Sequence, residues 1–325
     1  MTAIDLLRSV LSIFLSSVAP PLSIAAAGYL LGRVRDVDVD GLSAVTVYIL
    51  LPALVFETLV TTSIDVGTVA SIAGAMVAFT FLMGVVAWAT DRSRGQEGTV
   101  VYGAAMAAAI PNVGNFGIPV ASFAFGEAGR STAVLFVVVQ NLVLYTLGIY
   151  FLSKGRADGG HREAIRRVFG QPVLYAVLIA MTVAGLDAAP PADGTIMQTL
   201  GMVGDASIPI FLLILGLQVE KMDVGATVRQ TLPTVGLKLL VAPVVAVAVV
   251  ALIDVGDLAV TWAFVVLAAG PSAVTPMVLS IEFADDPDEG VSTGDYVGTV
   301  IFLTIFGSLP IVTGLILLAR SGVVA

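Results

Sequence analysis

The stretch that decides the fold is Pro111-Asn112-Val113-Gly114-Asn115-Phe116-Gly117-Ile118-Pro119, which lies within a long apolar run. Two prolines and two glycines within nine residues cannot continue an α-helix, because proline lacks a backbone donor and glycine costs about 1 kcal/mol relative to alanine. Unwound backbone at membrane depth is tolerated only where protein or water satisfies its polar groups. The stretch therefore predicts a broken helix that lines a cavity.

A second break is predicted in the other half of the chain, at Gly270-Pro271-Ser272-Ala273-Val274-Thr275-Pro276. Pro271 follows Pro111 by 160 positions, and Pro209 follows Pro52 by 157. These offsets indicate an internal repeat of five helices, an odd number that inserts the halves with opposite topology. The half-helix N-termini at the two breaks, each with about half a positive charge, would attract an anion where they meet.

The composition places the whole chain in a lipid bilayer. Of the 325 residues, 58% are hydrophobic and 12% charged, whereas a soluble domain has about 25% charged residues. A spanning helix needs about 20 mainly apolar residues. We therefore expect an all-α membrane protein of ten transmembrane helices, with the fourth and ninth broken, at residues 5–31, 41–60, 67–90, 98–125, 130–153, 171–187, 196–218, 227–253, 257–283 and 295–319.

The longest connection divides this single membrane domain into a first five-helix repeat (1–153), a cytoplasmic loop (154–170) and a second repeat (171–325). Basic residues set the orientation, since cytoplasmic loops carry an excess of Lys and Arg. The alternation places 11 of them on one side and three on the other, so we expect both termini outside the cell and a multi-pass protein of the plasma membrane. The larger set is Arg33, Arg35, Arg92, Arg94, Lys154, Arg156, Arg162, Arg166, Arg167, Lys221 and Arg229, and the smaller is Arg8, Arg130 and Arg320.

Several functional classes are disfavoured by what the sequence lacks. There is no cysteine, and the single histidine, His161, lies in a polar loop, so we expect no metal site and no cofactor. No P-loop motif is present, so energy would come from an ion gradient or from the membrane potential. We expect neither an enzyme nor a nucleic-acid partner. The net charge of −9 with only three lysines suits a salt-rich cytoplasm, or else reflects ordinary solvated loops.

A few polar residues in the apolar runs are candidates for function by default. Asp205 would exchange a proton or bind an ion near the site, or simply bond the backbone near the interface. Asn141 and Tyr145 are four residues apart, so they share a helix face; they either face the break or join helices. We expect Glu57 to lie at the interface and Lys238 to extend its ammonium towards water along the bilayer.

The broken segment resembles a known signature. Residues 111–119 are similar to the Asn-x-Gly-Asn-x-Gly-x-Pro motif of the auxin efflux carrier family, and residues 204–216 and the stretch after Pro271 resemble its seventh and ninth helices. That family includes plant auxin exporters and bacterial carriers described for malate or malonate. The resemblance implies the fold of sodium/bile-acid symporters, with two inverted repeats whose broken helices cross near Pro111 and Pro271. It also implies a scaffold or dimerisation part, hence a homodimer, and a part that moves like an elevator.

We therefore expect a secondary transporter that moves a small organic anion, such as a carboxylate or an auxin-like compound, across the bilayer. A sodium-coupled symporter of the bile-acid type is the alternative. A sodium/proton antiporter is less favoured, because neither break contains Asp or Glu. The predicted substrate site comprises Pro111, Asn112, Gly114, Asn115, Gly117, Asn141, Tyr145, Pro271, Ser272 and Thr275, with Asp205 as the coupling residue.

Overall fold

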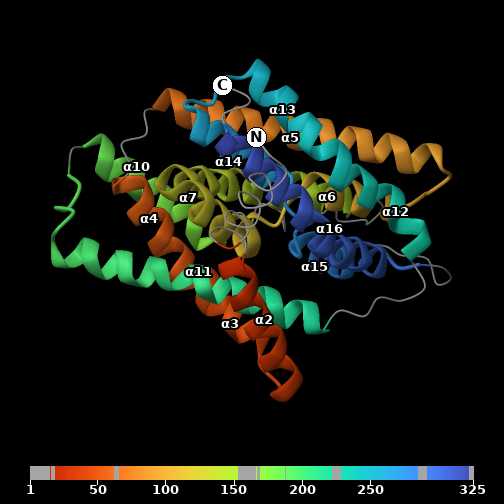
Figure 1. The fold of residues 1–325 in the computed structure, drawn as a ribbon, viewed down its shortest axis with the longest axis horizontal. Coiled ribbons are helices and arrows are strands. Elements are labelled where there is room, and N and C mark those ends of the chain that lie inside the picture. The colour runs from red at the N-terminus through yellow and green to blue at the C-terminus, as the bar shows by residue number, and fades with distance from the viewer. Residues whose placement is uncertain are drawn as a thin grey trace, which may run out of the picture.

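The structure is a computed structural model, and it describes residues 15, 19–61, 66–152, 166, 169–186, 188–221, 228–284 and 291–321. The predicted loop 154–170 and both chain ends lie almost wholly outside these ranges. Apart from one isolated β-bridge, the secondary-structure elements of the described residues are helices, and these helices cross one another at varied angles (Figure 1).

The helices of the first half follow the predicted ranges closely. They are α2 (Ala19–Val34), α3 (Val39–Val45), α4 (Leu51–Thr61), α5 (Val66–Ser93), α6 (Thr99–Ala109), α7 (Ile118–Val143) and α8 (Ile149–Leu152). Single π-helical turns at Thr46–Leu50, Val113–Gly117 and Leu144–Gly148 join α3 to α4, lead into α7 and join α7 to α8.

The second half is also helical. Its elements are α10 (Pro172–Gly185), α11 (Thr195–Lys221), α12 (Val228–Gly236), α13 (Ala242–Leu252), α14 (Leu258–Ala268), α15 (Thr275–Phe283) and α16 (Thr293–Ser321), with a π-helical turn at Leu237–Val241 between α12 and α13. Each of the ten predicted ranges therefore contains helix in the part of the chain that the structure describes.

Six of the described helical segments are long and apolar enough to cross a membrane: Val39–Thr61, Gly67–Ser93, Val113–Leu152, Thr195–Lys221, Val228–Leu252 and Thr293–Ser321. Three shorter apolar helices, α6, α10 and α14, accompany them. The shortness of α6 and α14 has a local cause, because each ends where the proline-rich breaks begin, at Ile110 and Ala269. The chain is therefore an all-helical, multi-pass membrane protein.

The predicted gap between the fourth and fifth helices is a sharp bend inside α7. Gly126 has φ +60° and ψ −138°, a conformation that residues with a Cβ rarely adopt. The chain changes direction at this residue and continues as helix on both sides. The boundary expected between residues 125 and 130 is therefore found at Gly126, where one glycine makes the turn.

The helices pack as two groups. The first helix group consists of α2, α3, α4, α10 and α11; the second helix group consists of α5 to α8 and α12 to α16. Figure 1 shows the first group along the lower and left side, with α5, α6 and α12 to α16 above and to the right. Between the groups, the principal contacts join α11 to Val113–Gly117 and α7, and α4 to α7.

Each group has its own close packing. In the first group, a Cβ on Gly216 of α11 would collide with the backbone of Ala25 and Tyr29, so glycine allows α2 and α11 to touch. In the second group, the Phe264 ring lies 6.4 Å from that of Phe79 and 5.2 Å from that of Phe136. These contacts make each group a compact unit, and the boundary between them passes beside the first break.

Candidate functional site

The two breaks pair with each other through their backbones. The amide of Asn112 donates to the Pro271 carbonyl at 2.7 Å, and the amide of Ala273 donates to the Ile110 carbonyl at 2.9 Å. These bonds form an antiparallel bridge between Pro111 and Ser272. Pro111 and Ser272, which are 161 positions apart, thus lie side by side, and the residues of both bonded segments are buried.

Side chains satisfy two of the helix-end carbonyls beside this bridge. The Ser272 hydroxyl donates to the Ala107 carbonyl in the last turn of α6 at 2.6 Å, and its amide donates to Thr304 Oγ1 at 3.1 Å. Lys238 Nζ donates to the Ala268 carbonyl at the end of α14, at 3.1 Å. Helix ends inside a membrane protein need such partners. The predicted site residue Ser272 is therefore fully engaged with the protein through its hydroxyl.

Asn112 has one satisfied end and one free end. Its Oδ1 accepts from the Asn115 amide at 3.2 Å and so caps the π-helical turn that follows. Its Nδ2 is buried and has no hydrogen-bond partner in the structure. An unmet buried donor costs about 1–3 kcal/mol, so Nδ2 is a candidate donor for a ligand that the structure does not contain.

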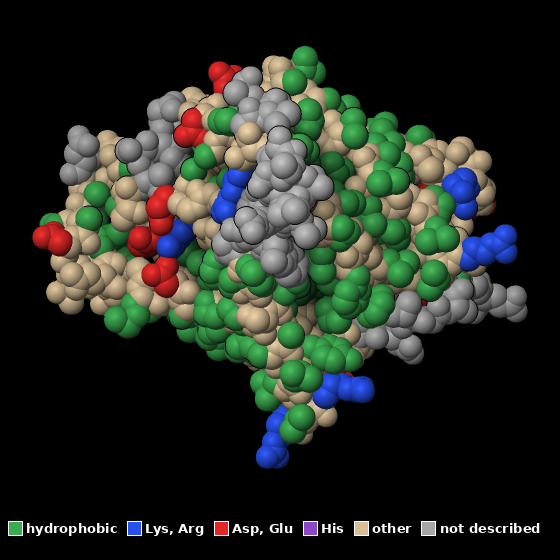
Figure 2. Space-filling model, in the orientation of Figure 1, with side chains coloured by type: hydrophobic (Ala, Val, Ile, Leu, Met, Phe, Trp, Pro, Cys, Tyr) green, Lys and Arg blue, Asp and Glu red, His purple; other side chains and the backbone are tan. Residues whose placement is uncertain are grey.

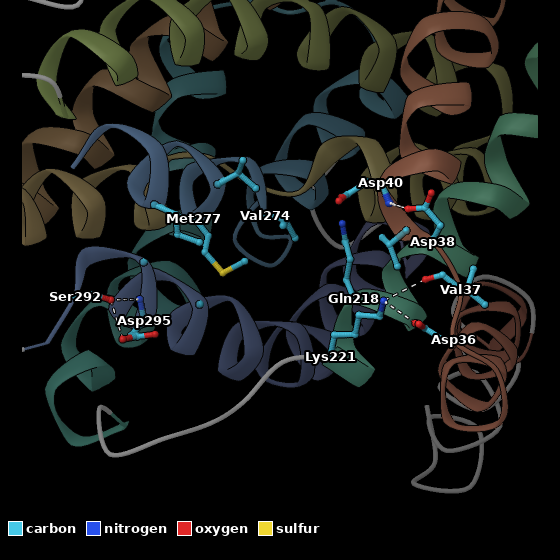
Figure 3. Close-up of a pocket in the computed structure, with 15 residues that line it drawn as sticks. Asp36, Val37, Asp38, Asp40, Gln218, Lys221, Val274, Met277, Ser292 and Asp295 are labelled. Carbon is cyan, nitrogen blue, oxygen red and sulfur yellow. Dashed lines mark hydrogen bonds and ion pairs between the residues drawn. The ribbon is translucent and has the colours of Figure 1, made fainter. Parts of the chain in front are cut away.

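Asn115 connects the first break to a cavity between the helix groups. Its Nδ2 donates to Gln218 Oε1 of α11 at 3.3 Å. Gln218 lines a cavity of about 750 Å³, and so does Val274, which directly precedes α15. Figure 3 shows Val274 and Met277 on one wall, with Gln218 and Lys221 on the opposite one. The cavity thus extends from Val274 of the second break, and from Gln218, the partner of Asn115, to the segments that follow α2 and precede α16.

The lining of this cavity is acidic. Its lining includes four aspartates, Asp36, Asp38, Asp40 and Asp295, against one cation, Lys221. Lys221 Nζ lies 3.6 Å from Asp36 Oδ1 and donates to the Val37 carbonyl at 3.1 Å (Figure 3). The net charge of the lining attracts cations and repels anions in dilute salt.

The other predicted site residues are distributed around the breaks. Gly114 and Gly117 lie in the π-helical turn after Asn112, and Thr275 begins α15. Asn141 and Tyr145 do share a face, but they border a separate small recess against the start of α10. Tyr145 also packs on the hydrophobic cluster that contains Ile110 and Ala273, so it lies behind the breaks. The structure therefore brings Tyr145 to the flank of the bridge and places Asn141 with it, away from the large cavity.

Asp205 belongs to an ionic cluster that joins the two helix groups. Arg130 of α7 donates to Asp205 Oδ1 of α11 and to Glu57 Oε2 of α4, each at 2.8 Å, and to Thr58 Oγ1 at 3.2 Å. The Arg130 side chain is 11% exposed. Arg130 was expected on the outer side of the membrane and Glu57 at the interface, but their pairing was not predicted, because the partners are 73 residues apart.

The position of Lys238 also differs from the one predicted from sequence. It was expected to extend along the bilayer towards water, but its side chain is fully buried within the protein. The bond to the Ala268 carbonyl and a position 5.9 Å from the centre of the Phe79 ring account for the inward orientation. Hydrophobicity alone did not distinguish a lysine facing lipid from one facing a helix end.

Comparisons with known proteins identify the family of the chain. A family model described as "Membrane transport protein" matches residues 13–316. An "Uncharacterized transporter" of Methanothermobacter thermautotrophicus is 28% identical over 307 residues, covering 92% of this chain and 98% of that protein. A "Putative malonate transporter" of Rhizobium meliloti is 23% identical over 320 residues, covering 94% and 95%. The chain therefore belongs to the membrane transport protein family, the family of auxin efflux carriers that its first break resembles.

Proposed function

We propose that this protein is a secondary transporter that carries a small organic anion, such as a dicarboxylate or an auxin-like compound, across the plasma membrane. One observation carries the proposal: two unwound, proline-containing segments pair at a buried bridge, and Asn112 Nδ2 there has no partner. Breaks of this kind bind substrate in transporters, where half-helix N-termini and free backbone groups meet. The similarity to a protein named as a malonate transporter suggests malonate as the first test substrate.

The proposed topology is ten transmembrane helices in two inverted five-helix repeats, 1–153 and 171–325, with both termini outside. The paired breaks at matching positions of the two halves support this arrangement. The distribution of charge supports the orientation, because Figure 2 shows basic side chains projecting at the right and lower edges, whereas the acidic ones lie mainly towards the left, with some basic side chains beside them and near the centre.

Transport would proceed by an elevator movement of the second helix group against the first, which in a homodimer would form the fixed centre. The sparse contacts between the groups support such sliding. The Arg130 cluster includes Asp205, and the cavity includes Gln218, which lies 13 residues later on α11, or about 20 Å along the helix. The two features are therefore at opposite ends of the boundary: one end is open through the cavity and the other is closed by ion pairs.

Uptake of labelled malonate into proteoliposomes tests the function. Asn112→Ala and Asn115→Ala should each lower uptake at least about tenfold, since each removes a donor from the site. Gln198→Ala removes an exposed amide at the start of α11 and is the matched control. Wild-type protein without uptake above empty vesicles would refute malonate transport, and unchanged uptake in both asparagine variants would move the site elsewhere.

A sodium-coupled symporter is the second candidate, and the four aspartates of the cavity favour it. Amide and carbonyl oxygens at the breaks are suitable sodium ligands. Uptake with and without an inward sodium gradient distinguishes the candidates: a symporter needs the gradient, whereas the main proposal expects equal rates. A sodium/proton antiporter is disfavoured, because neither break contains a carboxylate.

A further inference from the structure

Lys238 occupies an unusual environment for a lysine. Its side chain has no exposed surface, its Nζ donates to the Ala268 carbonyl at 3.1 Å, and the ring of Phe79 lies 5.9 Å away. No carboxylate of the described residues forms an ion pair with it. A buried ammonium without a counter-ion is costly, so its charge needs compensation from elsewhere.

The position of the amine links it to the paired breaks. Ala268 is the last residue of α14, and three residues later the Pro271 carbonyl accepts from Asn112. The C-terminal end of a helix carries about half a negative charge, which offsets only part of an ammonium. Lys238 therefore binds the end of one broken helix, three residues before the carbonyl that pairs with Asn112, and lies in the same helix group as both breaks.

The helices around Lys238 provide few other charges. Of the titratable groups on these helices, Asp91 and Tyr296 are buried. Arg92, Arg229, Asp295 and Arg320 are exposed, and Tyr102 is half-buried and stacks on Phe151. Helices α13 and α14 carry no titratable residue. Asp91 is therefore the buried carboxyl on these helices, and a bound anion at the breaks would add a negative charge beside the end of α14, where the amine binds.

A buried polar network leads from this helix towards the end of α5. The Thr234 hydroxyl donates to Asp91 Oδ2 at 3.1 Å and lies 2.8 Å from the Tyr296 hydroxyl, which is 3.5 Å from Asp91 Oδ1. Thr234 of α12 precedes Lys238, in the π-helical turn that follows, by four residues. The network therefore places hydroxyl and carboxyl groups about one helical turn along the chain from Lys238, at the end of α5.

We propose that Lys238 Nζ is the proton-binding site of this carrier, and that it takes up a proton together with the substrate anion. This inference rests on the proposed anion transport. The lone pair of the neutral amine accepts one proton from water to form the ammonium, and the ammonium returns that proton when the anion leaves. Because the two opposite charges stabilise each other in a dry interior, each ligand raises the affinity for the other by the same factor. Asp205, the coupling residue predicted from sequence, is paired with Arg130 in the structure.

The test compares two modes of malonate movement in proteoliposomes, at a pH where both malonate carboxyls are ionised. Exchange of malonate for malonate needs no net proton movement, whereas accumulation driven by a pH gradient does. Wild-type protein should accumulate up to about tenfold per pH unit. Lys238→Gln and Lys238→Met should raise the KM for malonate, because the coupled proton is lost, but at saturating malonate they should still exchange malonate while losing the pH-driven accumulation. Arg229→Gln, an exposed cation on the same helix, should retain both.

A second measurement uses the wild-type protein alone. Adding malonate to purified protein in weakly buffered solution with a pH indicator should cause uptake of about one proton per bound malonate. A Lys238→Gln variant that still responds to the pH gradient would overturn the inference, and so would malonate binding without proton uptake. Absence of malonate exchange in wild type would instead refute the proposed function.

Discussion

The guanidinium of Arg130 lies 2.8 Å from the carboxylate of Glu57, and this ion pair joins the second helix group to the first. Asp205 adds a second pair at 2.8 Å, but its side chain is 62% exposed, against 20% for that of Glu57. Exposed pairs are worth about 0–1 kcal/mol and shielded pairs more. The Glu57 contact should therefore contribute most of the cluster's effect on the boundary between the groups.

Breaking this cluster should shift the carrier away from the conformation in which the cavity is open. We expect Arg130→Gln to lower the accessibility of the cavity about fivefold, which corresponds to about 1 kcal/mol. Since the chain has no native cysteine, Val278→Cys on the cavity wall provides a single thiol whose labelling rate reports opening.

Asp205→Asn is the graded control for that experiment and should change the labelling rate less than Glu57→Gln does, in line with its exposure. Equal labelling in wild type and Arg130→Gln would show that the cluster stabilises the fold without selecting a conformation.

Substitution of Asn112 should leave the stability of the fold nearly unchanged and reduce transport. Asn112→Ala removes a cap worth about 1 kcal/mol, but it also removes the unpaired buried Nδ2, so the melting temperature should change little. Asn112→Asp keeps the capping oxygen and replaces the free donor with a second oxygen, which would repel an anion. We expect it to abolish malonate uptake more completely than alanine does, as measured by uptake alongside thermal unfolding. Aspartate retaining uptake better than alanine would argue against an anion at Nδ2.

Substitution of Ser272 should instead lower the stability of the fold and leave substrate affinity unchanged. Its buried hydroxyl is used within the protein, as a donor to the Ala107 carbonyl at 2.6 Å. Ser272→Ala leaves that carbonyl without this donor and should destabilise the fold by about 1–2 kcal/mol. The KM for malonate should remain near the wild-type value. A large rise in KM with unchanged thermal stability would instead show that the hydroxyl contacts the substrate.

The sequence predicted the features that depend on local chemistry. Prolines and glycines around Pro111 and Pro271 mark the breaks, because helix termination needs no distant partner. The Arg130–Glu57 pair and the burial of Lys238 depend on contacts between residues 30 to 73 positions apart, and a single sequence contains no signal for them. The bend at Gly126 falls between these cases, since a glycine there permits a turn without requiring one.

The acidic cavity leads to a prediction about salt that also separates the two candidate functions. Asp36, Asp38, Asp40 and Asp295 outnumber Lys221 in the lining, so in dilute solution they should slow the entry of an anion. The Debye length falls from about 10 Å at 0.1 M salt to about 3 Å at 1 M, so malonate uptake should rise with potassium chloride. Asp38 and Asp295 accept local hydrogen bonds, so Asp40→Asn is the substitution that changes the charge with the least effect on local structure. This variant should take up malonate faster than wild type in dilute salt and at the same rate as wild type at about 1 M salt. Uptake that falls in Asp40→Asn would contradict this and indicate that the aspartates recruit a coupling cation.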